Sequence, residues 1–319
     1  MTRRRPGRVR CLAHFFGVPF CAFRVFRGSF FPFFRSFFVF SIFCGSIFLT
    51  ATTAIAQDLT ALETTFRTGT TEQKRDALFQ IRNFRSEIAS RAALQALKDI
   101  DPIVRATAAS PVIFLPKPEA IAALTPNLAD KDAFVRKETA YALGTIENPD
   151  AAAPLLDLLR REKDLEVKAA VAVALGQTGS ISAVEPLIAL LKRAPKEDQE
   201  FLRRAAARSI GQIAQINRSG KERVVTPQSF LPEKFKDLTG DDLTTKFPVF
   251  STAVATLSSV LQNQKEADDT RREAAFALGT IGSRDSFAVL QTASNSADPY
   301  LAEIAREALA KLTNSVSVN

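Results

Sequence analysis

The stretch FVRKETAYALGTI, residues 134–146, places apolar and charged residues at the three- and four-residue spacing of a helix. Closely similar stretches follow as LEVKAAVAVALGQTG at 165–179 and DTRREAAFALGTIG at 269–282. The first two are 32 residues apart, measured from Gly144 to Gly176. A fixed period in the thirties is typical of stacked helical repeats.

Each copy predicts one helix followed by a second helix. An aspartate usually stands three residues before the valine of the Val-Arg or Val-Lys pair, where it is expected to cap the first helix. These aspartates are Asp101, Asp132 and Asp164. The repeated glycine near the end of the first helix is expected to adopt a left-handed conformation and end it. Second helices are predicted for AAAPLLDLLRR (151–161) and SAVEPLIALLKR (182–193).

The pattern D-x-x-V-R/K-x-x-x-A-x-A-L-G, followed by A-V-x-P-L-I-x-L-L, occurs at 132–159 and 164–191 and more loosely elsewhere. It resembles the HEAT family, specifically the short HEAT-like repeats of phycobilisome lyases. The resemblance covers about 71–313. It implies an all-α fold, an α-solenoid of stacked helical hairpins that forms a HEAT-like superhelix. The recurring arginine is expected to be structural and to bond with loops or carboxylates of the next repeat.

Residues 1–56 differ from the rest of the chain, since they hold eight arginines, no Asp or Glu, all three cysteines and the only histidine. A charge-free stretch at 36–50 is followed by ATTAIA, the pattern of a secretion signal. We expect cleavage after Ala56, with Ala54 and Ala56 as the small recognised residues and Gln57 as the new N-terminus. The mature protein would then be periplasmic or secreted. The alternative is an uncleaved leader that anchors the protein in the inner membrane.

The remaining residues, 57–319, form the predicted repeat array. They carry 34 Lys and Arg residues against 34 Asp and Glu residues, so the net charge of +8 lies in the leader. A neutral array attracts no polyanion through its overall field. We therefore predict no nucleic-acid partner, and membrane contact only if the leader is retained.

Polar positions of the second helices are candidates for partner binding, because we expect second helices to line the concave face of the array. They are Asp157, Arg160, Glu185 and Lys192. Both charge signs are present, which favours a protein or peptide partner. The alternative is that these residues form an ordinary solvated helix face.

An insertion at about 218–247 interrupts the repeats where a loop of a few residues is expected. It contains several large apolar side chains, among them Phe230 and Phe235, which are two further candidates for partner binding. A passive insertion is the alternative.

From Gln57 onward the chain has no histidine and no cysteine, so the commonest general base, the thiolate nucleophile and the usual zinc ligands are absent. We predict no catalytic residues, no metal site and no cofactor. The expected function is a non-catalytic scaffold for protein–protein interaction. The resemblance to phycobilisome lyases leaves a bilin-lyase-like chaperone or lyase as one alternative, and a retained leader makes a membrane-tethered scaffold another.

Overall fold

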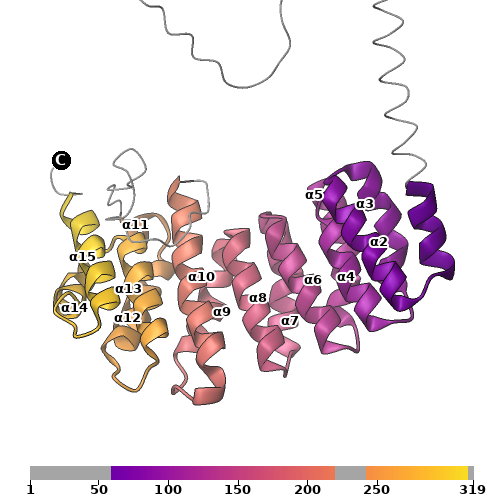
Figure 1. The fold of residues 1–319 in the computed structure, drawn as a ribbon. Helices are drawn as coiled ribbons and strands as arrows, with labels where there is room; N and C mark the ends of the chain where they lie inside the picture. The colour runs from indigo at the N-terminus through magenta and orange to yellow at the C-terminus, as the bar shows by residue number, and fades with distance from the viewer. Residues whose placement is uncertain (1–58, 220–241, 315–319) are drawn as a thin grey trace, which may run out of the picture. The chain divides into compact units, whose positions relative to one another are not determined.

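The computed structural model describes residues 59–219 and 242–314 (Figure 1). The predicted leader with its cleavage residues lies outside these ranges, and so do Phe230 and Phe235. Helices make up the regular structure of the described residues, and no strand occurs among them, which confirms the all-α class. Of the helices in these ranges, none is both long and apolar enough to cross a bilayer.

The helices alternate between two layers, which we call the inner and outer layers (Figure 1). The inner layer consists of α2 (Thr71–Phe84), α4 (Pro102–Val112), α6 (Ala133–Thr145), α8 (Leu165–Thr178), α10 (Glu200–Ser219), α13 (Asp268–Ile281) and α15 (Pro299–Asn314). The outer layer consists of α3 (Glu87–Ala93), α5 (Lys117–Leu124), α7 (Ala152–Arg161), α9 (Val184–Leu191), α12 (Val249–Gln262) and α14 (Phe287–Ala293).

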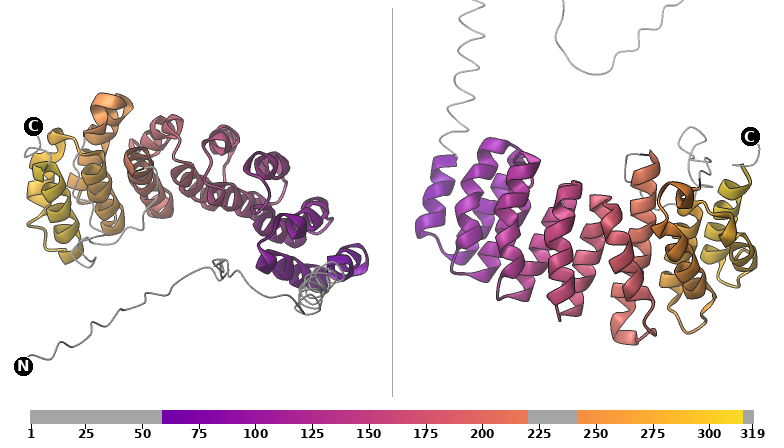
Figure 2. Two further views of the ribbon diagram at one scale, coloured as in Figure 1. Left: turned by 90° about the horizontal axis from the view of Figure 1, so that it is seen from above. Right: turned by 180° about the vertical axis from the view of Figure 1, so that it is seen from behind.

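Short elements precede or connect the helices of the two layers. Residues 59–68 form a helix before α2, and the four-residue helix α11 (Leu243–Lys246) precedes α12. The 3-10 turns are η1 (Leu94–Lys98), η2 (Thr125–Ala129), η3 (Pro149–Ala151), η4 (Ile181–Ala183), η5 (Glu197–Gln199) and η8 (Arg284–Ser286). Seen from above, the row of helices bends with the inner layer on the inside of the bend (Figure 2).

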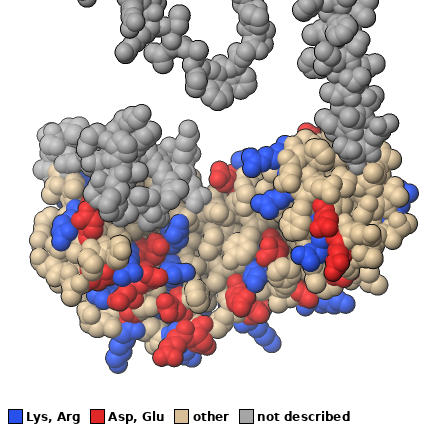
Figure 3. All heavy atoms as spheres, viewed as in Figure 1, with Lys and Arg blue, Asp and Glu red and all other residues tan. Residues whose placement is uncertain are grey.

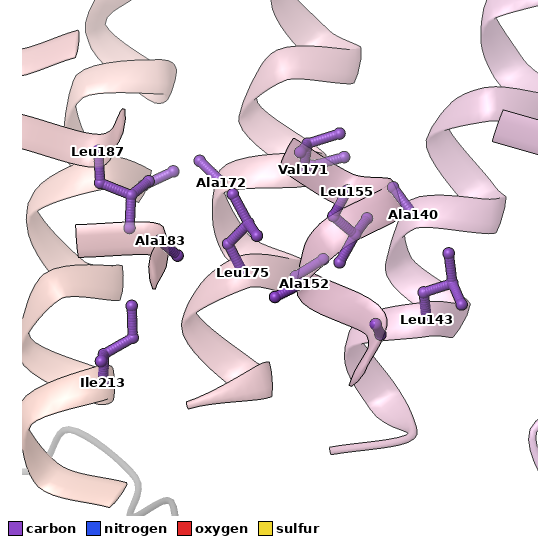
Figure 4. Packing of buried hydrophobic residues seen from close by; sticks show 14 of the residues in the cluster. Ala140, Leu143, Ala152, Leu155, Val171, Ala172, Leu175, Ala183, Leu187 and Ile213 are labelled. Atoms are coloured by element: carbon purple, nitrogen blue, oxygen red, sulfur yellow. The ribbon is translucent and has the colours of Figure 1, made fainter. Parts of the chain in front are cut away.

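Each inner helix packs against the next, from α2 through α15, so the array has one continuous core. Figure 4 shows a section of it, in which Leu155 of α7 lies beside Val171 of α8 and Leu187 follows on α9. From α7 onward, outer helices pack mainly on the inner helix that follows them: α7 on α8, α9 on α10, α12 on α13 and α14 on α15. The predicted solenoid of helical hairpins is confirmed. The sequence pattern paired each inner helix with the outer helix that follows it, whereas from α7 onward the closer contact is between an outer helix and the inner helix that follows it.

The aspartates cap the inner helices as predicted. A side-chain oxygen of Asp101 accepts from the amide of Ile103 at 2.8 Å, and Asp132 accepts from Phe134 at the same distance. Asp164 accepts from the amides of Glu166 and Val167. Each cap satisfies an amide of the first helical turn that has no partner within the helix.

The recurring arginine forms a repeated contact that we call the arginine clamp. Its guanidinium binds a carboxylate in the next loop through two hydrogen bonds and also donates to backbone carbonyls of the preceding loop. The three clamps are Arg105 with Asp130, Arg136 with Glu162 and Arg203 with Glu266. Because a planar guanidinium matches a carboxylate in this geometry, each clamp fixes the position of one repeat relative to the next.

The repeated glycines do not end their helices in a left-handed conformation, so that prediction is wrong. Among described glycines, positive φ occurs only at Gly179 and Gly282, which follow α8 and α13. Gly144 and its equivalents instead lie where neighbouring inner helices approach closely. A Cβ atom at Gly279 would stand 2.5 Å from the Cβ atom of Ala308 on α15. The glycine therefore permits helix contact.

Glu147 occupies the place after α6 that glycine occupies after α8 and α13, and it has φ 51°. We expect Glu147→Gly to raise the free energy of unfolding by about 0.5–1 kcal/mol, because glycine removes the steric cost of the left-handed region. Thermal unfolding followed by circular dichroism measures the change. As a control, Glu138→Gly within α6 should lower stability by about 1 kcal/mol. Destabilisation by both substitutions would contradict the prediction.

Candidate functional site

A groove of about 970 Å³ runs across five helices of the inner layer: α6, α8, α10, α13 and α15. Neighbouring inner helices provide both its floor and its walls, so it follows directly from the stacking of the repeats. Figure 3 looks onto this layer and shows positive and negative side chains interspersed over α10, α13 and α15. We call this surface the inner groove.

The apolar floor of the inner groove follows the helical spacing of α8. Leu165, Ala169 and Val173 are four residues apart, so they form a single stripe along the helix, and all three line the groove. Aromatic rings stand around this stripe. Phe201 on α10 is 69% exposed and Tyr300 on α15 is 65% exposed, so both rings are open to a partner.

Salt bridges cross the inner groove between α6 and α8, between α10 and α13, and between α13 and α15. Lys137 on α6 reaches Glu166 on α8 at 2.9 Å, and this carboxylate raises the pKa of the lysine. Arg204 on α10 reaches Asp269 on α13 at 2.8 Å. Arg272 on α13 donates to both Asp269 and, at 2.8 Å, Asp298. These partly exposed pairs line the charged side chains up along the groove, and each contributes at most about 1 kcal/mol to stability.

Aromatic rings also hold the cationic side chains of the inner groove. The guanidinium of Arg204 lies 5.2 Å from the centroid of the Phe201 ring, and that of Arg272 lies 5.3 Å from the Tyr300 ring. Such cation–π contacts orient a guanidinium plane while leaving its edge free to donate hydrogen bonds. The groove thus combines an apolar floor with oriented hydrogen-bond donors.

Glu273 on α13 is the one lining carboxylate with a raised pKa among those the structure describes. Burial is the main cause, with a smaller contribution from Asp269, and Arg208 and Arg204 act in the opposite direction. Its contact with Arg208 is long, at 3.5 Å, and its Oε2 atom is buried without a hydrogen-bond partner in the described part of the chain. The salt bridge between α10 and α13 is therefore weakest at this point.

Of the residues predicted for partner binding, the four that the structure describes do not line the inner groove. Asp157 and Arg160 lie on the exposed side of α7 and pair with each other. Glu185 and Lys192, on and just after α9, are exposed as well, and Lys192 lines a separate pocket of about 590 Å³ between α9 and α12. The expectation that second helices line the concave face is wrong, because those helices form the outer layer (Figure 2).

The sequence contains one signal for the groove that the repeat pattern does not reveal. Phe134 precedes Lys137 by three residues on α6, and Phe201 precedes Arg204 by three on α10. An aromatic ring and a cation at that spacing share a helix face and stay near its surface. The described residues include no cluster of His, Cys, Asp and Glu side chains suited to a metal ion.

Two repeat families match parts of the sequence. The family model described as HEAT repeats matches residues 90–176. The model described as PBS lyase HEAT-like repeat matches 167–193 and 270–296. No curated protein sequence matches the chain.

Several solved structures are similar to the chain at low identity. An engineered protein is 22% identical, with 80% of this chain and 68% of that chain covered and a TM-score of 0.48. The CpcE–CpcF complex of phycocyanin lyase from Nostoc sp. is 20% identical, with coverage of 80% and 91% and a TM-score of 0.44. Human deoxyhypusine hydroxylase is 20% identical, with coverage of 72% and 97% and a TM-score of 0.37. The family matches identify HEAT repeats in this chain, including repeats of the PBS lyase HEAT-like kind.

Proposed function

We propose that this protein is an exported, non-catalytic scaffold that binds an extended segment of a partner protein in the inner groove. The observation that carries the proposal is the groove itself, in which exposed aromatic rings and oriented charged side chains surround an apolar stripe. Protein-binding surfaces are enriched in aromatic residues and arginine in this way. The lack of histidine and cysteine after residue 56 supports a non-catalytic role.

The dimensions of the groove favour an extended segment as the occupant. Packed helices lie about 8–10 Å apart, and an extended chain advances about 3.4 Å per residue. A groove across five inner helices therefore accommodates roughly ten residues of extended peptide. Side chains of such a segment would meet the floor on α8 and the charged walls on α10 and α13 in succession.

A matched pair of variants tests the proposed function. Ala169→Glu places a charge on the groove floor, whereas Ala153→Glu makes the same change on the exposed side of α7 in the outer layer. We expect short peptides selected from a random library on the immobilised protein to lose at least tenfold in affinity for Ala169→Glu. They should bind Ala153→Glu like the unaltered protein. Equal binding to both variants, or no selectable peptide, would count against the proposal.

Export is the second part of the proposed function, and it determines which partners the scaffold meets. In the first 56 residues a basic segment is followed by a segment without charge and then by small residues. This order supports export. N-terminal sequencing of the protein from envelope fractions should give Gln57 as the first residue. A protein that keeps residues 1–56 and sediments with membranes would instead be a tethered scaffold.

A further inference from the structure

The arginines of the inner groove keep many hydrogen-bond donors unused. A guanidinium carries five N–H groups. In the described part of the chain, one N–H group of Arg204 donates to Asp269, and Arg208 makes only its long contact with Glu273. Two N–H groups of Arg272 donate, one to Asp298 and one to Asp269. The side chains of Arg204 and Arg208 remain 37% and 41% exposed, so a partner can reach them.

Most carboxylates beside these arginines are already occupied. Asp269 accepts from Arg204 at one oxygen and from Arg272 at the other. Asp298 caps α15 with one oxygen and accepts from Arg272 with the other. Glu273 keeps its side chain 15% exposed and its Oε2 atom buried. The surface over α10 and α13 therefore offers a partner free donors on Arg204 and Arg208, and its one exposed carboxylate outside these pairs, among the described lining residues, is Asp198 just before α10.

We propose that the segment bound in the inner groove is acidic where it crosses α10 and α13, with Asp or Glu carboxylates that pair with Arg204 and Arg208. This inference rests on the proposed function and specifies the class of partner. A carboxylate can accept two parallel hydrogen bonds from a guanidinium, and both arginines present free donors for that geometry. The stacking of Arg204 on Phe201 orients it before the partner arrives, which reduces the entropic cost of binding.

The part of the bound segment that lies over α8 is expected not to be acidic. Over α8 the floor is the apolar stripe Leu165, Ala169 and Val173. Beside it Glu166 is 79% exposed and would repel a second carboxylate at that end. Since adjacent inner helices are about 8–10 Å apart, apolar residues should precede or follow the acidic residues by about three positions. The partner motif therefore combines an apolar pair with an acidic cluster.

The composition of selected peptides tests this inference separately from the proposed function. Peptides selected from the random library on the full-length protein should be enriched severalfold in Asp and Glu at positions about three residues from their apolar pair. Their affinity for Arg208→Gln should fall about tenfold, as expected for loss of a charged hydrogen bond. Arg284→Gln in η8 is the matched control and should leave affinity unchanged, because Arg284 is exposed and lies outside the groove.

Folding of Arg208→Gln is checked by its far-ultraviolet circular dichroism and melting temperature, and its single 3.5 Å contact makes it a mild substitution. Arg204→Gln provides a second variant with the same expected loss. Groove-dependent peptides without acidic enrichment, or with unchanged affinity for both arginine variants, would overturn the inference and leave the proposed function standing. Failure to select any peptide that Ala169→Glu disrupts would overturn both.

Discussion

Replacement of Arg203 by methionine is expected to lower the free energy of unfolding by about 3–5 kcal/mol. Both partners of the Arg203–Glu266 clamp have side chains only 2% exposed, and two hydrogen bonds of 2.7 Å join them. The guanidinium also donates to the carbonyls of Leu190, Leu191 and Arg193. Without Arg203, a buried carboxylate and three carbonyls lose their donor together.

The position of the Arg203–Glu266 clamp makes its loss more destabilising to the array than its hydrogen bonds alone indicate. Arg203 and Glu266 are 63 residues apart, because the insertion lies between them in the sequence. The clamp joins the end of α9 and the start of α10 to the loop before α13, and so continues the stack across the insertion. In a repeat array, a weakened interface between neighbours lets the two sides unfold separately. We therefore expect a broader urea transition with a lower m-value.

Two control variants separate the buried clamp from a simple loss of charge. Arg160→Met removes one member of an exposed pair on α7 and should cost no more than about 1 kcal/mol. The double substitution Arg203→Met and Glu266→Met should cost less than Arg203→Met alone, since no buried charge is left without a partner. Urea unfolding followed by circular dichroism measures all of these. A loss below about 1 kcal/mol in Arg203→Met would show that the clamp does not hold the stack together.

The repeat pattern was sufficient to predict the fold. The aspartate caps a helix, the arginine of the Val-Arg pair clamps two repeats together, and the small residues after it permit close helix contact. Because every repeat must cover the apolar surface of its neighbour, these three roles recur at the period of the array. The all-α solenoid and its aspartate caps could therefore be predicted from the sequence alone.

The face used for the candidate site could not be derived in the same way. Both helices of a repeat bury one side and expose the other, so periodicity alone does not show which layer lies inside the bend. That choice depends on the small rotation between neighbouring repeats, which the packing of many side chains determines together. The predicted residues Asp157, Arg160, Glu185 and Lys192 consequently fell on or beside the outer layer. Their role in binding stays a prediction.

The clamp between Arg136 and Glu162 is expected to make the stability of the array depend on pH in acid. Burial alone would raise the pKa of Glu162, but the guanidinium of Arg136 and the amides of Asp164 and Lys163 outweigh it. The pKa of Glu162 is consequently lowered from its usual 4.5 to about 2. A carboxylate with a lowered pKa in the folded state stabilises the protein above its unfolded pKa, and this contribution is lost as the pH falls.

Comparison with Glu162→Gln isolates the contribution of this one carboxylate. The pKa difference corresponds to about 3 kcal/mol at neutral pH, and the side chain is only 5% exposed, so solvent screens it little. We expect the stability difference between the unaltered protein and Glu162→Gln to be largest at neutral pH. The difference should shrink as the pH falls from 4.5 towards about 2, where Glu162 takes up its proton in the folded state as well.

Urea unfolding at a series of pH values measures this difference. Other carboxylates with lowered pKa values, such as Asp101 and Asp130, are common to both proteins, so their titration cancels in the comparison. Glu166→Gln is the matched control, since Glu166 is 79% exposed, and its stability difference should stay small at every pH. A difference for Glu162→Gln that did not change across this acid range would mean that Arg136 does not hold Glu162 ionised in the folded array.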